Sequence, residues 1–346
     1  MQIAIGVAAV AVAAAAVYGW NGLKKTHEYS TSDYMEAEKA RPVGPAFNPD
    51  SAYSFVLQQC ELGPRPMNTA AHDRCVSYLK SKFAQYGCKV HTQQADLKGY
   101  DGTLLHATNI LARFNPNNPE RILICAHYDT RPWADNDPDT ANWRKPIVAA
   151  NDGASGPGVM IELARLLQQT QKQGETSTPA VGVDFLCLDA EDWGTPQWAD
   201  ATDDADTWAL GAQYFATHLP EGFTARYGIL LDMVGGQGAR FYREGVSKQY
   251  APDIVKKVWK AARHAGFGHF FPNSDGGMVT DDHVPLNEKA AIPTIDIIPY
   301  YPDCKQSSFG PTWHTLADDM DHIDKRTLQA VGQTIVQVIY SEEKQD

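Results

Sequence analysis

The chain has 346 residues, of which 43% are hydrophobic and 21% are charged, a balance typical of folded globular proteins. Its 42 acidic residues outnumber 30 basic ones, so the formal net charge is −12. Because binding to a phosphate backbone needs a basic surface, this charge argues against nucleic acid as a partner. Six cysteines without a C-x-x-C motif are too few for a disulfide scaffold, and the sequence leaves open which of them could pair.

The amino terminus has the composition of an export signal. Ile3 to Trp20 is an almost continuous apolar run without charge, and Lys24 and Lys25 follow it. This pattern predicts a signal peptide or membrane anchor over residues 1–23. We therefore expect an exported chain, periplasmic or anchored facing the periplasm, with membrane contact only through this segment. A buried helix of a cytosolic protein is the alternative.

Two further regions follow this segment. Residues 24–49 are polar, contain Pro42 and Pro45, and predict a linker or a strap over the domain. Residues 50–346 alternate between helix and strand patterns without a second linker or an internal repeat, which predicts one catalytic domain.

The periodicity of this domain predicts its elements in chain order. Helices are expected at 51–60, 68–86, from about 154, at 210–218, at 251–265 and from 325. Strands are expected at 90–97, 106–114, 121–126, 181–188, 227–231 and 292–298. Four of the strands are continuously apolar (ILICA, VDFLCL, GILL and TIDII), as in strands that are buried on both faces. The interleaving predicts a doubly wound α/β fold, with a mainly parallel sheet that is mixed at its edge.

Histidines and carboxylates follow the buried strands. They are His127 and Asp129 after RILICA, Glu191 and Asp192 after VDFLCLDA, Asp232 after GILL, and His314 beyond the strand at 292–298. Asp152 comes just before a predicted helix. Any one of these motifs alone is typical of a solvated turn. Together they are expected to meet, because open α/β sheets bind ligands at the carboxyl ends of their strands.

Carboxylates brought together without a counter-ion repel one another and raise one another's pKa. A bound divalent cation removes this conflict. Imidazole nitrogen and carboxylate oxygen, without cysteine, are the ligands of a catalytic zinc that keeps one position open for substrate. Within H-x-D, we expect Asp129 to orient the ring of His127 rather than to bind the metal itself.

The motifs HYD, NDGASGPGVMIELAR, the acidic pair after DFLCLDA, LLDMVG and WHT resemble those of the co-catalytic zinc aminopeptidases. Within that superfamily, the stretch DDHVP (281–285), Trp313 before His314, and Trp193 and Trp198 are similar to the animal-type glutaminyl cyclases (glutaminyl-peptide cyclotransferases) and their bacterial relatives. The resemblance covers nearly all of the chain after about residue 50.

The resemblance to the cyclases implies one zinc, with Asp152, Asp192 and His314 as its ligands. It implies that Glu191 is the general acid and base. Asp232 and Asp281 match the acidic residues that form hydrogen bonds in the active site, and Asp282 is a weaker candidate. In the aminopeptidases, His127 and Asp232 would complete a second zinc site.

Two details accompany this assignment. Both families usually have Glu where this chain has Asp192, so the shorter side chain must be compensated by the position of the backbone. The resemblance also implies a cis peptide bond between Asp152 and Gly153.

Tryptophans are expected to form an apolar pocket wall beside the metal. Trp313 adjoins a metal ligand, and Trp198 and Trp193 follow the acidic pair. We expect Trp143, Trp208 and Trp259 to lie in the core. Aromatic walls with a few polar groups suit the small uncharged side chain of Gln.

The sequence thus favours an exported zinc-dependent glutaminyl cyclase that acts on peptides and proteins with N-terminal Gln. The alternative is a two-zinc aminopeptidase on the same scaffold. A third hypothesis is a non-enzymatic binding ectodomain, which is disfavoured because every ligand position holds a competent residue.

Overall fold

The computed structural model describes residues 40–173, 178–199 and 205–343. The predicted export segment and most of the predicted linker lie outside these residues, so export stays a prediction. Among the described helices, none is long and apolar enough to cross a membrane. Residues 40–346 form one compact unit.

Six strands form one sheet in the order β1-β2-β4-β3-β5-β6. They are β1 (Lys89–Lys98), β2 (Leu104–Phe114), β3 (Arg121–His127), β4 (Gly182–Leu188), β5 (Gly228–Leu231) and β6 (Thr294–Ile297). β4, β3, β5 and β6 pair in parallel, whereas β2 pairs antiparallel with both β1 and β4. The prediction of a mainly parallel sheet that is mixed at one edge is confirmed.

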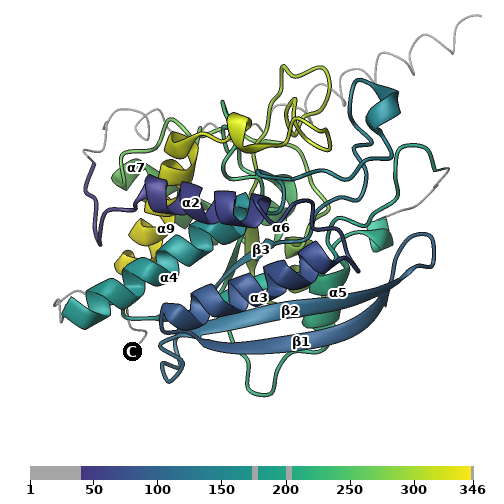
Figure 1. Cartoon of the computed structure of the whole chain (residues 1–346). Helices are drawn as coiled ribbons and strands as arrows, with labels where there is room; N and C mark the ends of the chain where they lie inside the picture. The colour runs from purple at the N-terminus through teal and green to yellow at the C-terminus, as the bar shows by residue number, and fades with distance from the viewer. Residues whose placement is uncertain (1–39, 174–177, 200–204, 344–346) are drawn as a thin grey trace, which may run out of the picture. The chain divides into compact units, whose positions relative to one another are not determined.

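Helices cover both faces of the sheet. They are α2 (Pro49–Cys60), α3 (Ala70–Gln85), α4 (Ser155–Gln173), α5 (Leu210–Thr217), α6 (Gly245–Tyr250), α7 (Pro252–His264), α8 (His283–Glu288) and α9 (Lys325–Ser341). Figure 1 shows α3 and α4 across one face, with α2 and α9 beside α4. All the predicted helices are present. α6 and α8 were not predicted, because six residues are too few for a helical period to stand out.

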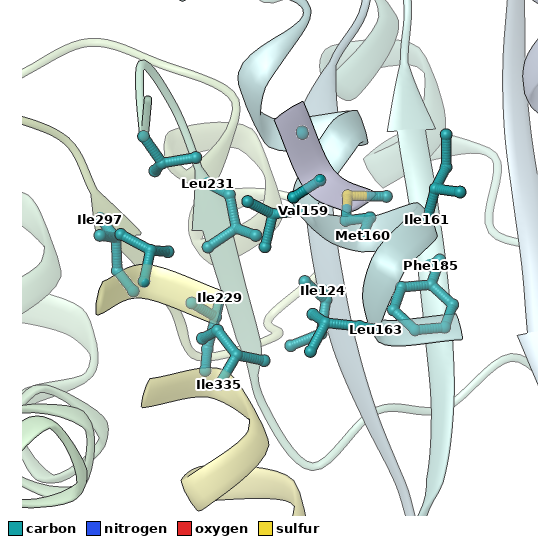
Figure 2. Close-up of a cluster of buried hydrophobic side chains, with 14 of the residues drawn as sticks. Ile124, Val159, Met160, Ile161, Leu163, Phe185, Ile229, Leu231, Ile297 and Ile335 are labelled. Atoms are coloured by element: carbon teal, nitrogen blue, oxygen red, sulfur yellow. The ribbon is translucent and has the colours of Figure 1, made fainter. Parts of the chain in front are cut away.

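The side-chain alternation of the strands divides the core into two layers. Ile122 and Ile124 of β3 belong to the larger cluster with α2, α3, α4, α7 and α9, whereas Leu123 and Cys125 belong to a second cluster with α5 and α8. Figure 2 shows Ile124 in the larger cluster, among side chains of neighbouring strands and of α4 and α9. β3 is buried on both faces, and this burial explains the continuously apolar run ILICA within it.

The described end of the predicted linker packs on α9. The backbone N–H groups of Val43 and Phe47 donate to the side chains of Gln337 and Gln333. The ring of Phe47 occupies the space that a Cβ at Gly332 would fill. Residues 40–48 therefore run along the surface of the domain as a strap, up to the start of α2.

All six cysteines are free thiols. Cys125 and Cys187 lie in β3 and β4 and are fully buried. Burial raises the pKa of both thiols well above the ordinary range, because a thiolate is disfavoured in an apolar environment.

The first turn of α4 packs tightly against the sheet at Gly156, which gives a test of the fold. A Cβ there would meet the carbonyl oxygen of Leu231 and, at 2.6 Å, the Cβ of Ala126. Gly156→Ala is therefore expected to lower the free energy of unfolding by about 1–3 kcal/mol, measured by denaturant titration. Gly277→Ala is the control, because a Cβ at Gly277 meets no atom within 4 Å. Equal stability of both variants would contradict the packing described here.

Candidate metal centre

The parallel strands deliver the polar side chains to one edge of the sheet. His127 is the last residue of β3, and Asp232 directly follows β5. Glu191 and Asp192 follow β4 after a short turn in which Ala190 has a φ of 53°. Asp152 precedes α4, and His314 reaches the same edge from the long loop after β6. Residues far apart in sequence therefore meet, because parallel strands end on the same side.

Asp152, Asp192 and His314 form the first candidate metal set. One ligand atom from each lies within 4.8 Å of the others, and all three side chains are buried. Nε2 of His314 lies 3.5 Å from Oδ2 of Asp152 and 3.3 Å from Oδ1 of Asp192. Oδ2 of Asp192 is buried without a hydrogen-bond partner. An unsatisfied carboxylate oxygen among such donors fits a zinc ion.

A second set shares Asp152. Nε2 of His127 lies 3.0 Å from Oδ1 of Asp152 and 3.2 Å from Oδ1 of Asp232. These three residues again offer ligand atoms within 4.8 Å of one another. Each carboxylate oxygen of Asp152 thus faces a different histidine, which is the arrangement a carboxylate bridging two metal ions would need.

The backbone around Asp152 is fixed by another carboxylate. Asp318 accepts hydrogen bonds from the N–H groups of Asn151 (2.7 Å) and Asp152 (3.0 Å). Gly153 has a φ of 106°, and a Cβ there would collide with the carbonyl oxygen of Asp129. The expected cis bond between Asp152 and Gly153 is wrong, since the described residues contain no cis peptide. The positive φ of Gly153 and the two hydrogen bonds to Asp318 set the direction of this turn instead.

Asp129 holds the acidic pair in place. Its two oxygens accept hydrogen bonds from the N–H groups of Glu191 and Asp192, both at 3.1 Å. Its nearest oxygen lies 3.7 Å from Nδ1 of His127, which is too long for a hydrogen bond. Asp129 therefore acts mainly on the loop that carries Glu191 and Asp192, and on His127 only through charge.

Arg131 and Asp135 belong to the site and were not predicted. The buried guanidinium of Arg131 donates to both oxygens of Asp135 (2.8 and 2.7 Å) and lies 3.2 Å from Oδ1 of Asp192. Asp135 in turn lies 3.5 Å from Nδ1 of His314. Burial opposes ionisation of Asp135, but Arg131 and His314 still hold its pKa well below the usual range. The signal that could have revealed them in the sequence is their spacing, since Arg131 and Asp135 are an oppositely charged pair four residues apart in TRPWAD.

These contacts explain how the shorter Asp192 reaches its place. Its N–H is held by Asp129 and its carboxylate by Arg131. These contacts fix both the backbone and the carboxylate of Asp192 beside the other two residues of the set.

Both histidines are buried among acids. Burial alone lowers the pKa of a histidine, but Asp192 and Asp135 raise the pKa of His314. Carboxylates of Asp129, Asp152 and Asp232 likewise raise the pKa of His127 well above its ordinary value. The site thus attracts positive charge strongly, either as a proton or as a metal ion.

The site opens into a cavity of about 280 Å³ that Asp152, Glu191, Asp232, Asp281 and His314 line on one side. Burial raises the pKa of Glu191 well above its ordinary value, and Asp192 and Asp281 add to this effect while His127 opposes it. Burial and the charge of Asp232 similarly raise the pKa of Asp281. The surroundings of Glu191 therefore favour its protonated form.

The aromatic wall of the cavity differs from the prediction. Trp313 and Trp208 line it, and both rings stack on the ring of His314, at centroid distances of 3.7 and 6.1 Å. The predicted wall residues Trp193 and Trp198 are not among the lining residues. Both pack against Trp133 beside the site. Trp208 was expected in the core. It lines the cavity instead, and the N–H of the next residue, Ala209, donates to the carbonyl oxygen of Glu191 at 3.1 Å.

Comparison with known proteins relates the chain to one enzyme family. Residues 109–339 match the sequence pattern of peptidase family M28. The crystal structure of glutaminyl cyclase from Bacteroides thetaiotaomicron bound to N-acetylhistamine is 51% identical, with a TM-score of 0.83 over 87% of this chain and 100% of that one.

Two curated relatives are more distant. Aminopeptidase YwaD of Bacillus subtilis is 27% identical over 73% of this chain and 49% of its own length. The glutaminyl-peptide cyclotransferase of Bos taurus is 23% identical over 68% of this chain and 66% of its own length. The chain therefore spans about half to two thirds of these relatives.

The first test of the site is the loss of a proposed ligand. His314→Ala is expected to weaken zinc binding at the Asp152–Asp192–His314 set by more than about 100-fold, because it removes the only imidazole of this set. Calorimetric titration of metal-stripped protein with zinc measures the affinity. His91→Ala, at an exposed histidine of β1, is the control. Wild-type affinity of the His314 variant would refute the assigned site.

The second test uses pH. Burial raises the pKa of Asp282 to about 8 and that of Asp318 to about 7, from 3.8, with help from Asp129 and Asp232 for the first and Asp152 for the second. Such groups favour the fold while protonated, so their contribution is lost as pH rises through this range. The Tm of the metal-free chain should therefore fall between about pH 5 and about pH 8, and zinc should reduce this fall. The same pH dependence with and without zinc would contradict this electrostatic account.

Proposed function

This chain belongs to peptidase family M28, and we propose that it is a zinc-dependent glutaminyl cyclase. It would convert the N-terminal Gln of peptides and proteins to pyroglutamate with release of ammonia. One observation carries the proposal: the zinc set Asp152–Asp192–His314 and the protonatable Glu191 meet in one small cavity with aromatic walls. The 51% identity to a glutaminyl cyclase supports it.

The reaction needs a proton carrier and a site for a single residue. The α-amine of Gln attacks its own γ-carboxamide carbon, a C–N bond forms, and the amide nitrogen leaves as ammonia. Glu191 would accept the proton from the amine and deliver it to the leaving nitrogen. Its raised pKa favours holding the proton between the two transfers.

Zinc held by Asp152, Asp192 and His314 would supply Lewis acidity toward the carboxamide oxygen. Trp208 and Trp313 would enclose the uncharged side chain and exclude water. Asp232 and Asp281 line the same cavity, where their carboxyl groups can hold the substrate amine by hydrogen bonds. The attack is intramolecular and requires no activated water, so one zinc ion suffices.

A two-zinc aminopeptidase is the second candidate. The observation that favours it is Asp152, whose two oxygens face His127 and His314 separately. Mass spectrometry of a Gln-initiated peptide after incubation distinguishes the two functions. Release of ammonia with every residue retained supports the cyclase, and loss of the first residue supports the peptidase.

Glu191→Gln tests the role of the proton carrier. The variant keeps the size of the side chain but removes the carboxylate, so turnover of a Gln-initiated peptide should fall by about 10²–10⁴-fold. Its zinc affinity should stay unchanged, because Glu191 is outside the metal set. Coupled ammonia detection measures turnover. Glu288→Gln, at an exposed glutamate of α8, is the control. Substantial remaining activity would mean that another residue moves the proton.

A further inference from the structure

A third cluster of metal-ligating side chains lies behind the cavity. Asp281, His283 and Asp296 each offer one ligand atom, and these atoms all lie within 4.8 Å of one another. All three side chains are buried, and Asp296 and His283 are completely inaccessible. The cluster shares no residue with the two metal sets around Asp152.

The two ring nitrogens of His283 have different surroundings. Its Nε2 lies 3.2 Å from Oε2 of Glu244, whereas its Nδ1 is buried without a hydrogen-bond partner. Glu244 is itself fixed by the N–H groups of Val246, Ser247 and Val279. A carboxylate that engages one ring nitrogen fixes the ring and leaves the other nitrogen free to bind a metal.

The same network holds Asp296. Oγ of Ser247 donates to Glu244 and accepts the N–H of Asp296. The side chain of Asn287 joins the carbonyl of His283 on α8 to the backbone of Thr294 on β6. The relative positions of His283 and Asp296 are therefore set before any ligand arrives.

The oxygens of the cluster lack partners. Both carboxylate oxygens of Asp296 and Oδ2 of Asp281 are buried without a hydrogen bond, while Oδ1 of Asp281 accepts from the N–H of Asp282. Burial raises the pKa of Asp296 well above its ordinary value, and the charges of Asp281, Asp232 and Glu244 raise it further. Buried polar atoms are otherwise almost always satisfied, so these oxygens require a proton or a cation.

We propose that Asp281, His283 and Asp296 bind a divalent metal ion of the Zn²⁺ type, at a site separate from the sets around Asp152. Two carboxylates and one imidazole form the mixed ligand set that such ions accept. Asp281 also lines the active-site cavity, which gives the ion a route of entry. The ion would neutralise the buried carboxylates and tie α8 to β6. The site shares Asp281 with the cavity of the proposed function, so zinc content and ammonia release are measured separately.

Counting zinc tests the proposal. The full chain is stripped with a chelator, reloaded with Zn²⁺, desalted and analysed for bound metal. Asp296→Asn and His283→Gln should each lose one zinc equivalent relative to the wild type, while Asp282→Asn, at the neighbouring buried carboxylate outside the cluster, should lose none. His314→Ala should lose a different equivalent, so a double variant with Asp296→Asn should lose both. Wild-type zinc content in the first two variants would overturn the proposal.

A measurement on the wild type covers the case in which a variant does not fold. Crystals of the reloaded chain should show an anomalous peak at the zinc absorption edge between Asp281, His283 and Asp296. The absence of that peak would overturn the proposal and would mean that Asp281 and Asp296 share protons instead. Ammonia release from a Gln-initiated peptide is measured separately, so the cyclase proposal stands or falls without this result.

Discussion

The site depends on the contacts that the carboxylate of Asp152 makes with two histidines. One of its oxygens faces His127 and the other faces His314, so this single side chain joins the end of β3 to the loop after β6. Its own backbone is held by Asp318, and the turn that follows it needs the positive φ of Gly153. A displaced Asp152 would therefore remove one ligand from both metal sets at once.

This arrangement leaves buried carboxylates without a positively charged partner. Glu191, Asp281 and Asp296 are buried, and burial raises the pKa of each. Elsewhere the fold satisfies its buried carboxylates directly, as it does for Asp184, whose partners are Arg121 and Arg113. Close to Asp152 and Asp296 carboxylate oxygens are left without partners. This contrast points to cations at the centre of the site.

Much of the fold could be predicted because its signals are local. The apolar runs that became β3 and β4 are buried on both faces, and a run of this kind is recognisable from composition alone. The short helices α6 and α8 were missed, since six residues are too few for a helical period to stand out and since contacts in the folded chain fix them in place. Glu244 caps α6, and α8 is tied to β6 through Asn287.

Within the site, the sequence singled out residues that the structure brings together in the metal sets, but not the residues that hold them in place. Asp192 and His314 stood out as polar residues beside strongly apolar strands. Arg131 and Asp318 act through contacts with residues about 60 and 166 positions away, respectively. The local charge pair of Arg131 with Asp135 does not reveal its contact with Asp192, and no local pattern reveals Asp318. The tryptophans could not be assigned from local patterns either. Trp198 was predicted to line the cavity and Trp208 lines it instead, because the tertiary structure decides which of them reaches the cavity.

The sequence by itself determined that the chain forms a mainly parallel sheet and that histidines and carboxylates follow its buried strands. Hydrophobic periodicity and residue type are local properties, so both could be recognised without the structure. Only the tertiary structure decided which oxygen faces which histidine, which tryptophans form the wall and which buried carboxylates lack a partner. Those properties depend on distances of a few ångströms between segments far apart in sequence, and packing sets such distances.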